Sequence, residues 1–349
     1  MPLNVSPSFA QDCRNKINVC FISMSERSNT REIMQINKYL YSFTYDNTET
    51  ELSKLETRSI FNAEETNKLI FSDVKIEPSS SAFIKNRLEV ILSSENYISL
   101  IEAIKKEHIH VEDFKVEYLV MKGDTIEYSR RLEKLKDIGY SIEGNPDYYH
   151  PVITYALGNY KGIWLFGILN KDKFDWQKHQ KKPFSYSNSI NINTAKALVN
   201  IAGNGKKEKT LLDACCGAGT IMLEACFAEK NIEGCDINWK LCKAARNNLA
   251  HFNYSAEIFR SDIKDITKRY DAAIVDLPYN LLSVATDKDI IHIVESTSTI
   301  TDRLVIVSIS DITDIIKNTR LSISDYCVVG KPGNVKFARR IWVCEKNNL

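Results

Sequence analysis

Two glycines stand between a predicted strand and a predicted helix, where a ligand can approach the backbone. The strand covers residues 210–214, the helix covers about 219–229, and Gly217 and Gly219 lie between them. Free N–H groups at the start of such a helix attract a carboxylate or a phosphate. A glycine-rich helix cap without a ligand has the same pattern, so the turn alone does not show that a ligand binds here. Met222 occupies the position of the third glycine of a G-x-G-x-x-G motif, and no P-loop is present.

Four aspartates end successive predicted strands of the same region. Asp213 lies at the end of strand 210–214, and Asp236, Asp262 and Asp276 close the strands at 231–236, 256–260 and 271–276. Ligands of doubly wound sheets bind at the carboxyl ends of the strands. Asp236 can accept hydrogen bonds from both hydroxyls of a ribose there, and Asp262 can accept a hydrogen bond from the amino group of an adenine. A single aspartate is often only a turn or cap residue, but four with the glycine turn favour a nucleoside site.

The sequence Asp276-Leu-Pro-Tyr suits chemistry on the exocyclic amine of a base. Such an amine is a poor nucleophile, because its lone pair is delocalised into the ring. The Asp276 carboxylate and the Leu277 carbonyl can hold both amine hydrogens, and Asp276 can take the proton after attack. Pro278 restricts the backbone, and Tyr279 offers a face on which a base can stack.

These motifs, in this order and spacing, resemble the S-adenosylmethionine-dependent methyltransferases of the amino-methylating class, which carry a [DNS]-P-P-[YFW] motif. Residues 183–202 are similar to the lead-in helix of the tRNA guanosine N2-methyltransferases. That family places a ferredoxin-like domain and a THUMP RNA-binding domain ahead of its catalytic sheet, and residues 138–153 resemble the THUMP pattern. Leu277 departs from the family, in which a proline usually follows the acid.

The resemblance implies transfer of a methyl group from S-adenosylmethionine to N2 of a guanosine in tRNA. Its implied catalytic residues are Asp276, Leu277, Pro278 and Tyr279. Its implied cofactor-binding residues are Asp213, Cys215, Gly217, Gly219, Asp236, Ile237, Asp262 and Ile263. The alternatives are amino-methylation of ribosomal RNA, DNA adenine or protein glutamine, and an RNA-binding module that keeps the cofactor pocket without turnover.

A basic segment with interleaved aromatic residues joins the two halves of the chain. Residues 171–186 contain five lysines against two aspartates, together with two phenylalanines, a tryptophan and a tyrosine. This mixture suits RNA phosphates and unstacked bases, and a solvated linker explains it equally well. The predicted RNA contacts are Lys178, His179, Lys181 and Lys182.

The composition limits the remaining possibilities. The 349 residues carry 46 Lys and Arg against 45 Asp and Glu, which argues against wrapping nucleic acid by overall positive charge. The sequence has no apolar run long enough for a bilayer, no secretory signal and no zinc-ligand spacing, and its nine cysteines are an odd number. We therefore expect a cytoplasmic protein without a membrane span or a metal, and a helper subunit stays an open possibility.

The order of the predicted elements gives the domain organisation. Residues 1–33 are expected to be a polar, poorly ordered extension, 34–110 a ferredoxin-like domain and 111–180 a THUMP-like RNA-binding domain. A β-α-β-β-α-β order over about 37–121 supports the ferredoxin-like prediction. From 181 to 349 strands alternate with helices and end in a hairpin. This predicts an α/β fold with a doubly wound, Rossmann-like methyltransferase sheet of seven strands and a C-terminal antiparallel hairpin.

Overall fold

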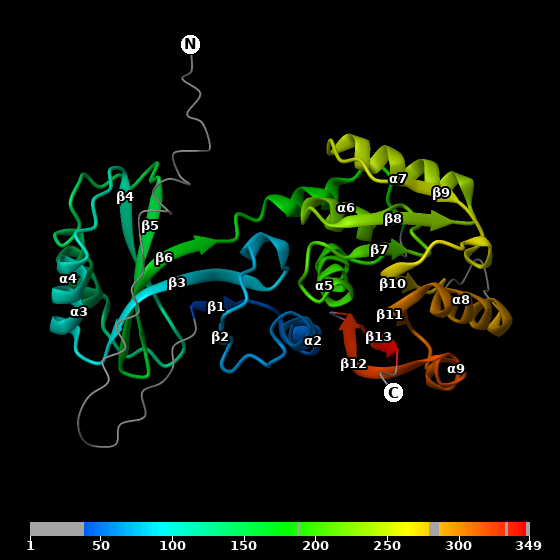
Figure 1. Cartoon of the computed structure of the whole chain (residues 1–349), viewed down its shortest axis with the longest axis horizontal. Helices are drawn as coiled ribbons and strands as arrows, with labels where there is room; N and C mark the ends of the chain where they lie inside the picture. Colours follow the sequence, from blue (N-terminus) through cyan, green and yellow to red (C-terminus); the bar gives the residue numbers. More distant parts are fainter. Residues whose placement is uncertain (1–37, 187–188, 279–285, 332–333, 347–349) are drawn as a thin grey trace, which may run out of the picture.

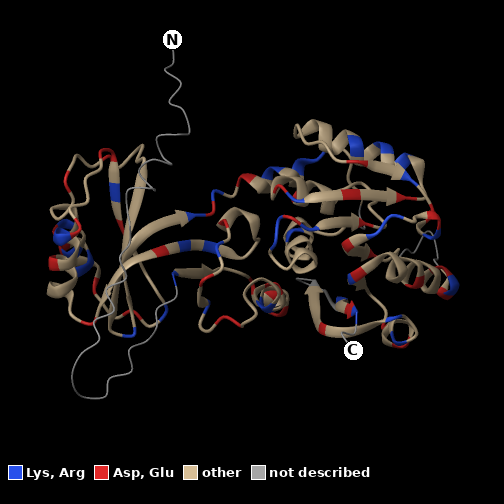
Figure 2. Cartoon of the chain, in the orientation of Figure 1, with Lys and Arg blue, Asp and Glu red and all other residues tan. Residues whose placement is uncertain are grey.

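The computed structural model describes residues 38–186, 189–278, 286–331 and 334–346, and these form two β-sheets with helices packed on them (Figure 1). The predicted extension 1–33 lies outside the described residues, and its prediction stays untested. In the view of Figure 2, both signs of charge are interspersed over both sheets and their helices. This mixture agrees with the nearly balanced composition.

The C-terminal sheet has seven strands in the order β12-β13-β11-β10-β7-β8-β9. Its strands are β7 (Thr210–Asp213), β8 (Asn231–Asp236), β9 (Ile258–Arg260), β10 (Tyr270–Asp276), β11 (Thr301–Ser308), β12 (Leu321–Lys331) and β13 (Asn334–Lys346). The five strands from β7 to β11 pair in parallel, whereas β13 is antiparallel to both β11 and β12. The Rossmann-like sheet and its antiparallel hairpin are therefore confirmed.

Helices cover both faces of this sheet, as parallel strands require. They are α5 (Ile192–Gly203), α6 (Thr220–Phe227), α7 (Trp239–His251), α8 (Asp287–Ile300) and α9 (Thr313–Lys317), with a short 3-10 turn η4 (Ile263–Asp265). Leu211 faces a core that includes α5, α6 and α7, whereas its neighbour Leu212 faces a second core with Val294 of α8 and Ile316 of α9. Alternating residues of one strand thus bury both faces.

The N-terminal sheet has six strands in the order β2-β1-β3-β6-β5-β4. Its elements are β1 (Tyr39–Phe43), α2 (Thr50–Phe61), β2 (Leu69–Ser72), β3 (Ile84–Ser94), α3 (Tyr97–Lys106), β4 (Phe114–Leu119), α4 (Tyr128–Gly139), β5 (Ile153–Tyr160) and β6 (Ile163–Lys171), with the 3-10 turns η1 (Asn47–Glu49) and η2 (Pro78–Ser80). A third 3-10 turn, η3 (Asp175–Lys181), leads to the C-terminal sheet.

The strand pairing corrects the ferredoxin-like prediction. The β-α-β-β-α-β order is present, but β4 pairs with β5 and with none of β1, β2 and β3. Strands from both sides of the predicted boundary at 110 therefore join one sheet. The physical reason is that β3 pairs with β1 along one edge and with β6 along the other, with a bulge between Val90 and Leu92, so that β6 and β5 lie between β3 and β4. The THUMP-like character of 111–180 stays a prediction.

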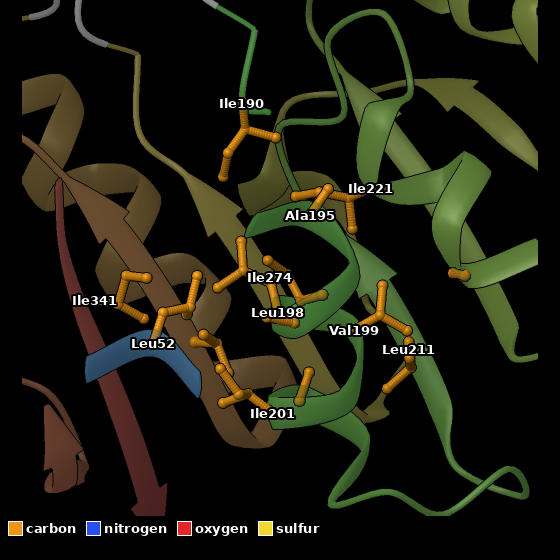
Figure 3. Packing of buried hydrophobic residues seen from close by; sticks show 14 of the residues in the cluster. Leu52, Ile190, Ala195, Leu198, Val199, Ile201, Leu211, Ile221, Ile274 and Ile341 are labelled. Atoms are coloured by element: carbon orange, nitrogen blue, oxygen red, sulfur yellow. The ribbon is translucent and has the colours of Figure 1, made fainter. Parts of the chain in front are cut away.

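Helix α2 connects the two sheets through a common core. Leu52 and Leu55 are fully buried, and Leu52 lies beside Ile341 of β13 and Ile201 of α5 (Figure 3). In the same interface Arg58 binds Asp325 of β12 through two hydrogen bonds, Nε to Oδ2 at 2.7 Å and Nη2 to Oδ1 at 2.8 Å. The N-terminal part is thus packed onto the C-terminal sheet rather than tethered to it.

Truncation of a residue in this common core should destabilise both parts together. We expect Leu52→Ala to lower the free energy of unfolding by about 2–5 kcal/mol, since Leu52 is fully buried. The control Leu132→Ala removes a side chain that is 42% exposed and should change it by less than about 0.5 kcal/mol. Denaturant unfolding followed by tryptophan fluorescence measures both, and an unchanged Leu52→Ala midpoint would contradict the common core.

Candidate active site

Parallel pairing brings three of the predicted aspartates to one edge of the C-terminal sheet. Asp213 of β7 is paired with Ile274 of β10 on one side and with Gly234 of β8 on the other. Asp276 and Asp236 each lie two residues beyond those partners, at the carboxyl ends of β10 and β8. Neighbouring strands are about 4.8 Å apart. The three carboxylates, named here the carboxylate edge, are therefore close neighbours.

The glycine turn lies against the carboxylate edge. The N–H of Gly217 donates to Asp236 Oδ2 at 3.0 Å, and Gly219 is the N-cap of α6. Both glycines adopt left-handed backbone angles, with φ of 53° at Gly217 and 79° at Gly219. A Cβ at Gly219 would lie 3.0 Å from the Cβ of Ala245, whereas one at Gly217 would meet nothing within 4 Å. Gly219 therefore serves packing, and Gly217 leaves room for a ligand.

Burial raises the pKa values of all three carboxyl groups of the carboxylate edge. Asp213 is 1% exposed, and its two oxygens have no hydrogen-bond partner among the described residues. Burial, followed by the charges of Asp276 and Asp236, raises its pKa well above the usual value. Burial also raises the pKa of Asp236, although the N–H groups of Asn238 and Gly217 lower it in part.

Asp276 has a buried carboxylate oxygen that is available to accept a hydrogen bond from a ligand. Its Oδ1 is buried and has no hydrogen-bond partner among the described residues. Burial raises the pKa of Asp276 to about 7, against the opposing charge of Arg339. Leu277 is buried, and its N–H donates to the Val307 carbonyl at 3.0 Å, which fixes the residue that follows the acid. Pro278 is exposed, and Tyr279 lies outside the described residues.

Asp262 follows the next strand along the same sheet edge. Its Oδ1 accepts from His292 Nε2 at 2.9 Å and from the Lys264 N–H at 3.1 Å. The His292 hydrogen bond is the main cause that lowers the pKa of Asp262. Sequence reasoning missed His292, because it lies in α8, thirty positions further along the chain, where no motif marks it.

The other predicted cofactor residues differ in accessibility. Ile237 directly follows Asp236 and is 68% exposed, so its side chain is free to contact a ligand. Ile263 is 4% exposed and belongs to the same core as Leu212 and Val294, which leaves only its backbone for the predicted contact with an adenine. Cys215 is partly exposed, and burial of its thiol raises the pKa. The thiol is therefore protonated at neutral pH.

One predicted RNA contact is wrong. His179 is fully buried, with Nδ1 2.7 Å from Glu224 Oε1 and Nε2 3.2 Å from the Tyr254 hydroxyl. Trp176 is buried as well, because residues three apart in a 3-10 turn lie on the same side. Lys178 and Lys181 are exposed on η3. The sequence could not tell which side of this turn faces the protein.

The sequence also did not predict that a lysine is buried near this turn. Lys196 of α5 is 1% exposed, and its Nζ lies 3.3 Å from Glu224 Oε2 and 4.3 Å from the centre of the Phe227 ring. Burial lowers the pKa of Lys196, which Glu224 partly restores. Glu224 therefore joins α5 to His179 of η3. Lys182 is half-buried, and burial lowers its pKa too.

Within residues 38–186, 189–278, 286–331 and 334–346, no helix is long and apolar enough to cross a bilayer. The same ranges contain no group of three or more His, Cys, Asp and Glu side chains placed to hold a metal ion.

The catalytic half of the chain has recognisable relatives. Residues 179–305 match the family described as "RMKL-like, methyltransferase domain". These residues form a methyltransferase domain. The tRNA (guanine(10)-N2)-dimethyltransferase of Methanothermobacter thermautotrophicus is 32% identical over 117 residues, which are 33% of this chain and 34% of that protein. The protein of the same description from Methanocaldococcus jannaschii is 30% identical over 113 residues, 29% of this chain and 32% of that protein.

The chain thus matches about a third of the length of these curated relatives. Among solved structures, TrmN from Thermus thermophilus aligns with a TM-score of 0.44 at 14% identity, over 88% of this chain and 99% of that one. The strand order of the C-terminal sheet is the direct evidence for the fold of the methyltransferase domain.

The buried position of His179 predicts a loss of stability on its removal. We expect His179→Ala to lower the free energy of unfolding by about 2–4 kcal/mol, because it leaves a cavity and removes the hydrogen-bond partner of the buried Glu224 Oε1. Lys178→Ala, one residue earlier on the exposed side, should leave it within about 0.5 kcal/mol. Thermal or denaturant unfolding measures both, and equal stabilities of the two variants would contradict this placement.

Proposed function

We propose that this chain is an S-adenosylmethionine-dependent RNA methyltransferase that methylates the exocyclic N2 amine of a guanosine in tRNA. The observation that carries the proposal is Asp276, whose buried Oδ1 has no hydrogen-bond partner among the described residues, at the carboxylate edge of a methyltransferase domain. The two relatives described as tRNA (guanine(10)-N2)-dimethyltransferases support the choice of N2 and of tRNA.

The residues of the carboxylate edge fit the cofactor. The space at Gly217 and the first N–H groups of α6 suit the carboxylate of its methionine end. Each oxygen of Asp236 accepts one backbone N–H, from Asn238 or Gly217, and keeps a further lone pair for a ribose hydroxyl. Asp262, held by His292, would accept the adenine amine. When bound, S-adenosylmethionine supplies an electrophilic methyl group on a sulfonium.

The chain's own residues would then prepare the base amine. Asp276 Oδ1 and the Leu277 carbonyl accept the two amine hydrogens, which orients the nitrogen lone pair. The hydrogen bond from the Leu277 N–H to Val307 holds this acceptor pair in place without the usual proline. Asp276 takes the proton that the amine loses after attack. The raised pKa of Asp276 makes the carboxylate a better base than an exposed aspartate.

We propose that the exposed side of the linker contacts RNA. Lys178 and Lys181 are exposed there, and the aromatic side chains of Phe174, Phe184 and Tyr186 are 42–48% exposed. Trp176 and His179 anchor the opposite side in the methyltransferase domain. Exposed aromatic faces near ammonium groups suit unstacked bases and phosphates.

Removal of the Asp276 carboxylate should abolish transfer without unfolding the domain. We expect Asp276→Ala to lower the rate of methyl transfer from labelled cofactor to unmodified tRNA by about 10²–10⁴-fold, the usual contribution of a positioned base. The control Asp271→Ala lies at the opposite end of β10, where Asp271 binds Thr210, and should keep most of the activity. Equal incorporation by wild type and Asp276→Ala would remove Asp276 from the mechanism.

The raised pKa of Asp276 predicts that the rate of methyl transfer rises with pH while the stability of the fold falls. Transfer should fall about tenfold per pH unit below about 7, where Asp276 becomes protonated. The pKa of Asp276 is higher in the folded than in the unfolded chain. The free energy of unfolding therefore falls as the pH rises from about 4 to about 7, and it stays at the lower value above pH 7. Asp276→Asn should therefore unfold at a higher denaturant concentration than wild type at pH 8, and the difference should shrink toward pH 4. A flat rate profile from pH 6 to 8 would contradict this assignment.

A further inference from the structure

A buried asparagine of α7 connects the glycine turn to the linker. Asn248 is fully buried, and its Nδ2 donates to the carbonyls of Ala218 and Phe184, both at 2.8 Å. Its Oδ1 accepts from the Phe184 N–H at 2.9 Å. One side-chain amide therefore satisfies both backbone groups of Phe184 and the carbonyl at the centre of the turn.

These contacts fix the orientation of one peptide group, that between Ala218 and Gly219. Its carbonyl accepts from Asn248, and its N–H donates to the Cys216 carbonyl at 2.8 Å. Ala245, one helical turn before Asn248, packs against Gly219 from the same face of α7. Rotation of this peptide would break both hydrogen bonds and move the first N–H groups of α6.

We propose that Asn248 is a positioning residue for the cofactor, since it holds the Gly217–Gly219 turn in the conformation that leaves room at Gly217. This inference rests on the proposed function. Without Asn248 the turn and the Phe184 segment lose their shared anchor and must be ordered during binding, which weakens affinity. Asn248 touches the backbone of the turn and acts through it.

The chain offers a matched control in Asn200 of α5. Asn200 is also fully buried, and its Nδ2 also donates twice, to Glu56 Oε1 at 2.7 Å and to the Ser80 carbonyl at 2.8 Å. These partners belong to the N-terminal part and not to the glycine turn. Truncation of either asparagine removes the same groups from a buried site, but only one of them should change the cofactor site.

The test is calorimetric titration of S-adenosylhomocysteine into the full chain, below the unfolding temperature of each variant. We expect Asn248→Ala to raise Kd at least about tenfold, equivalent to the loss of one good hydrogen bond, and Asn200→Ala to leave it within about twofold. Asn248→Asp keeps the shape and the acceptor but loses both donors, so it should also raise Kd about tenfold. This variant decides the question if Asn248→Ala does not fold.

Two outcomes separate this inference from the function on which it rests. Binding by wild type with both Asn248 variants within about twofold of it would overturn the positioning role and leave the proposed function intact. Equal weakening by Asn200→Ala would also overturn it, since the effect would then be a general loss of stability. Absence of binding by wild type would overturn the proposed function itself.

Discussion

The parallel pairing of β10, β7 and β8 is the constraint on which the site depends. It forces three carboxyl groups, Asp276, Asp213 and Asp236, to one sheet edge, where burial raises their pKa values and the charges of the other two raise that of Asp213 further. Buried like charges oppose folding, so the apolar cores on both faces of the sheet must supply the compensating stability. Such an arrangement is typical of a site whose carboxyls serve a ligand rather than the fold.

The N-terminal part stabilises this site indirectly. Helix α2 shares a core with α5 and β13, and the paired hydrogen bonds between Arg58 and Asp325 lie at the same interface. From there α5 reaches the linker, because Lys196 binds Glu224 and Glu224 binds His179. Asn248 then joins the linker to the glycine turn, because its side chain binds the backbone carbonyls of Phe184 and Ala218. A continuous series of buried contacts thus joins the predicted RNA-binding half to the predicted cofactor site, which favours a rigid relation between the two.

The sequence predicted the methyltransferase sheet well, since its strands and helices alternate with short turns and local patterns decide them. The helix predicted over about 219–229 is observed as α6 over Thr220–Phe227, and β8 has the predicted bounds. Pairing across long separations was not predictable: β4 lies at the far edge of a six-stranded sheet because β5 and β6 intervene. The buried position of His179 depends on Glu224 and Tyr254, 45 and 75 residues away, and no local spacing reports such partners. The domain boundaries and the roles of the site residues stay predictions.

The most direct test of the account is the affinity of the full chain for S-adenosylhomocysteine, measured by calorimetry for wild type and Asp236→Ala. The account predicts saturable one-to-one binding by wild type and at least about tenfold weaker binding by Asp236→Ala, because the variant loses the carboxylate that would hold the ribose and that accepts the Gly217 N–H. Absence of binding by wild type, or equal affinity of the two proteins, would contradict the claim that the carboxylate edge is a cofactor site.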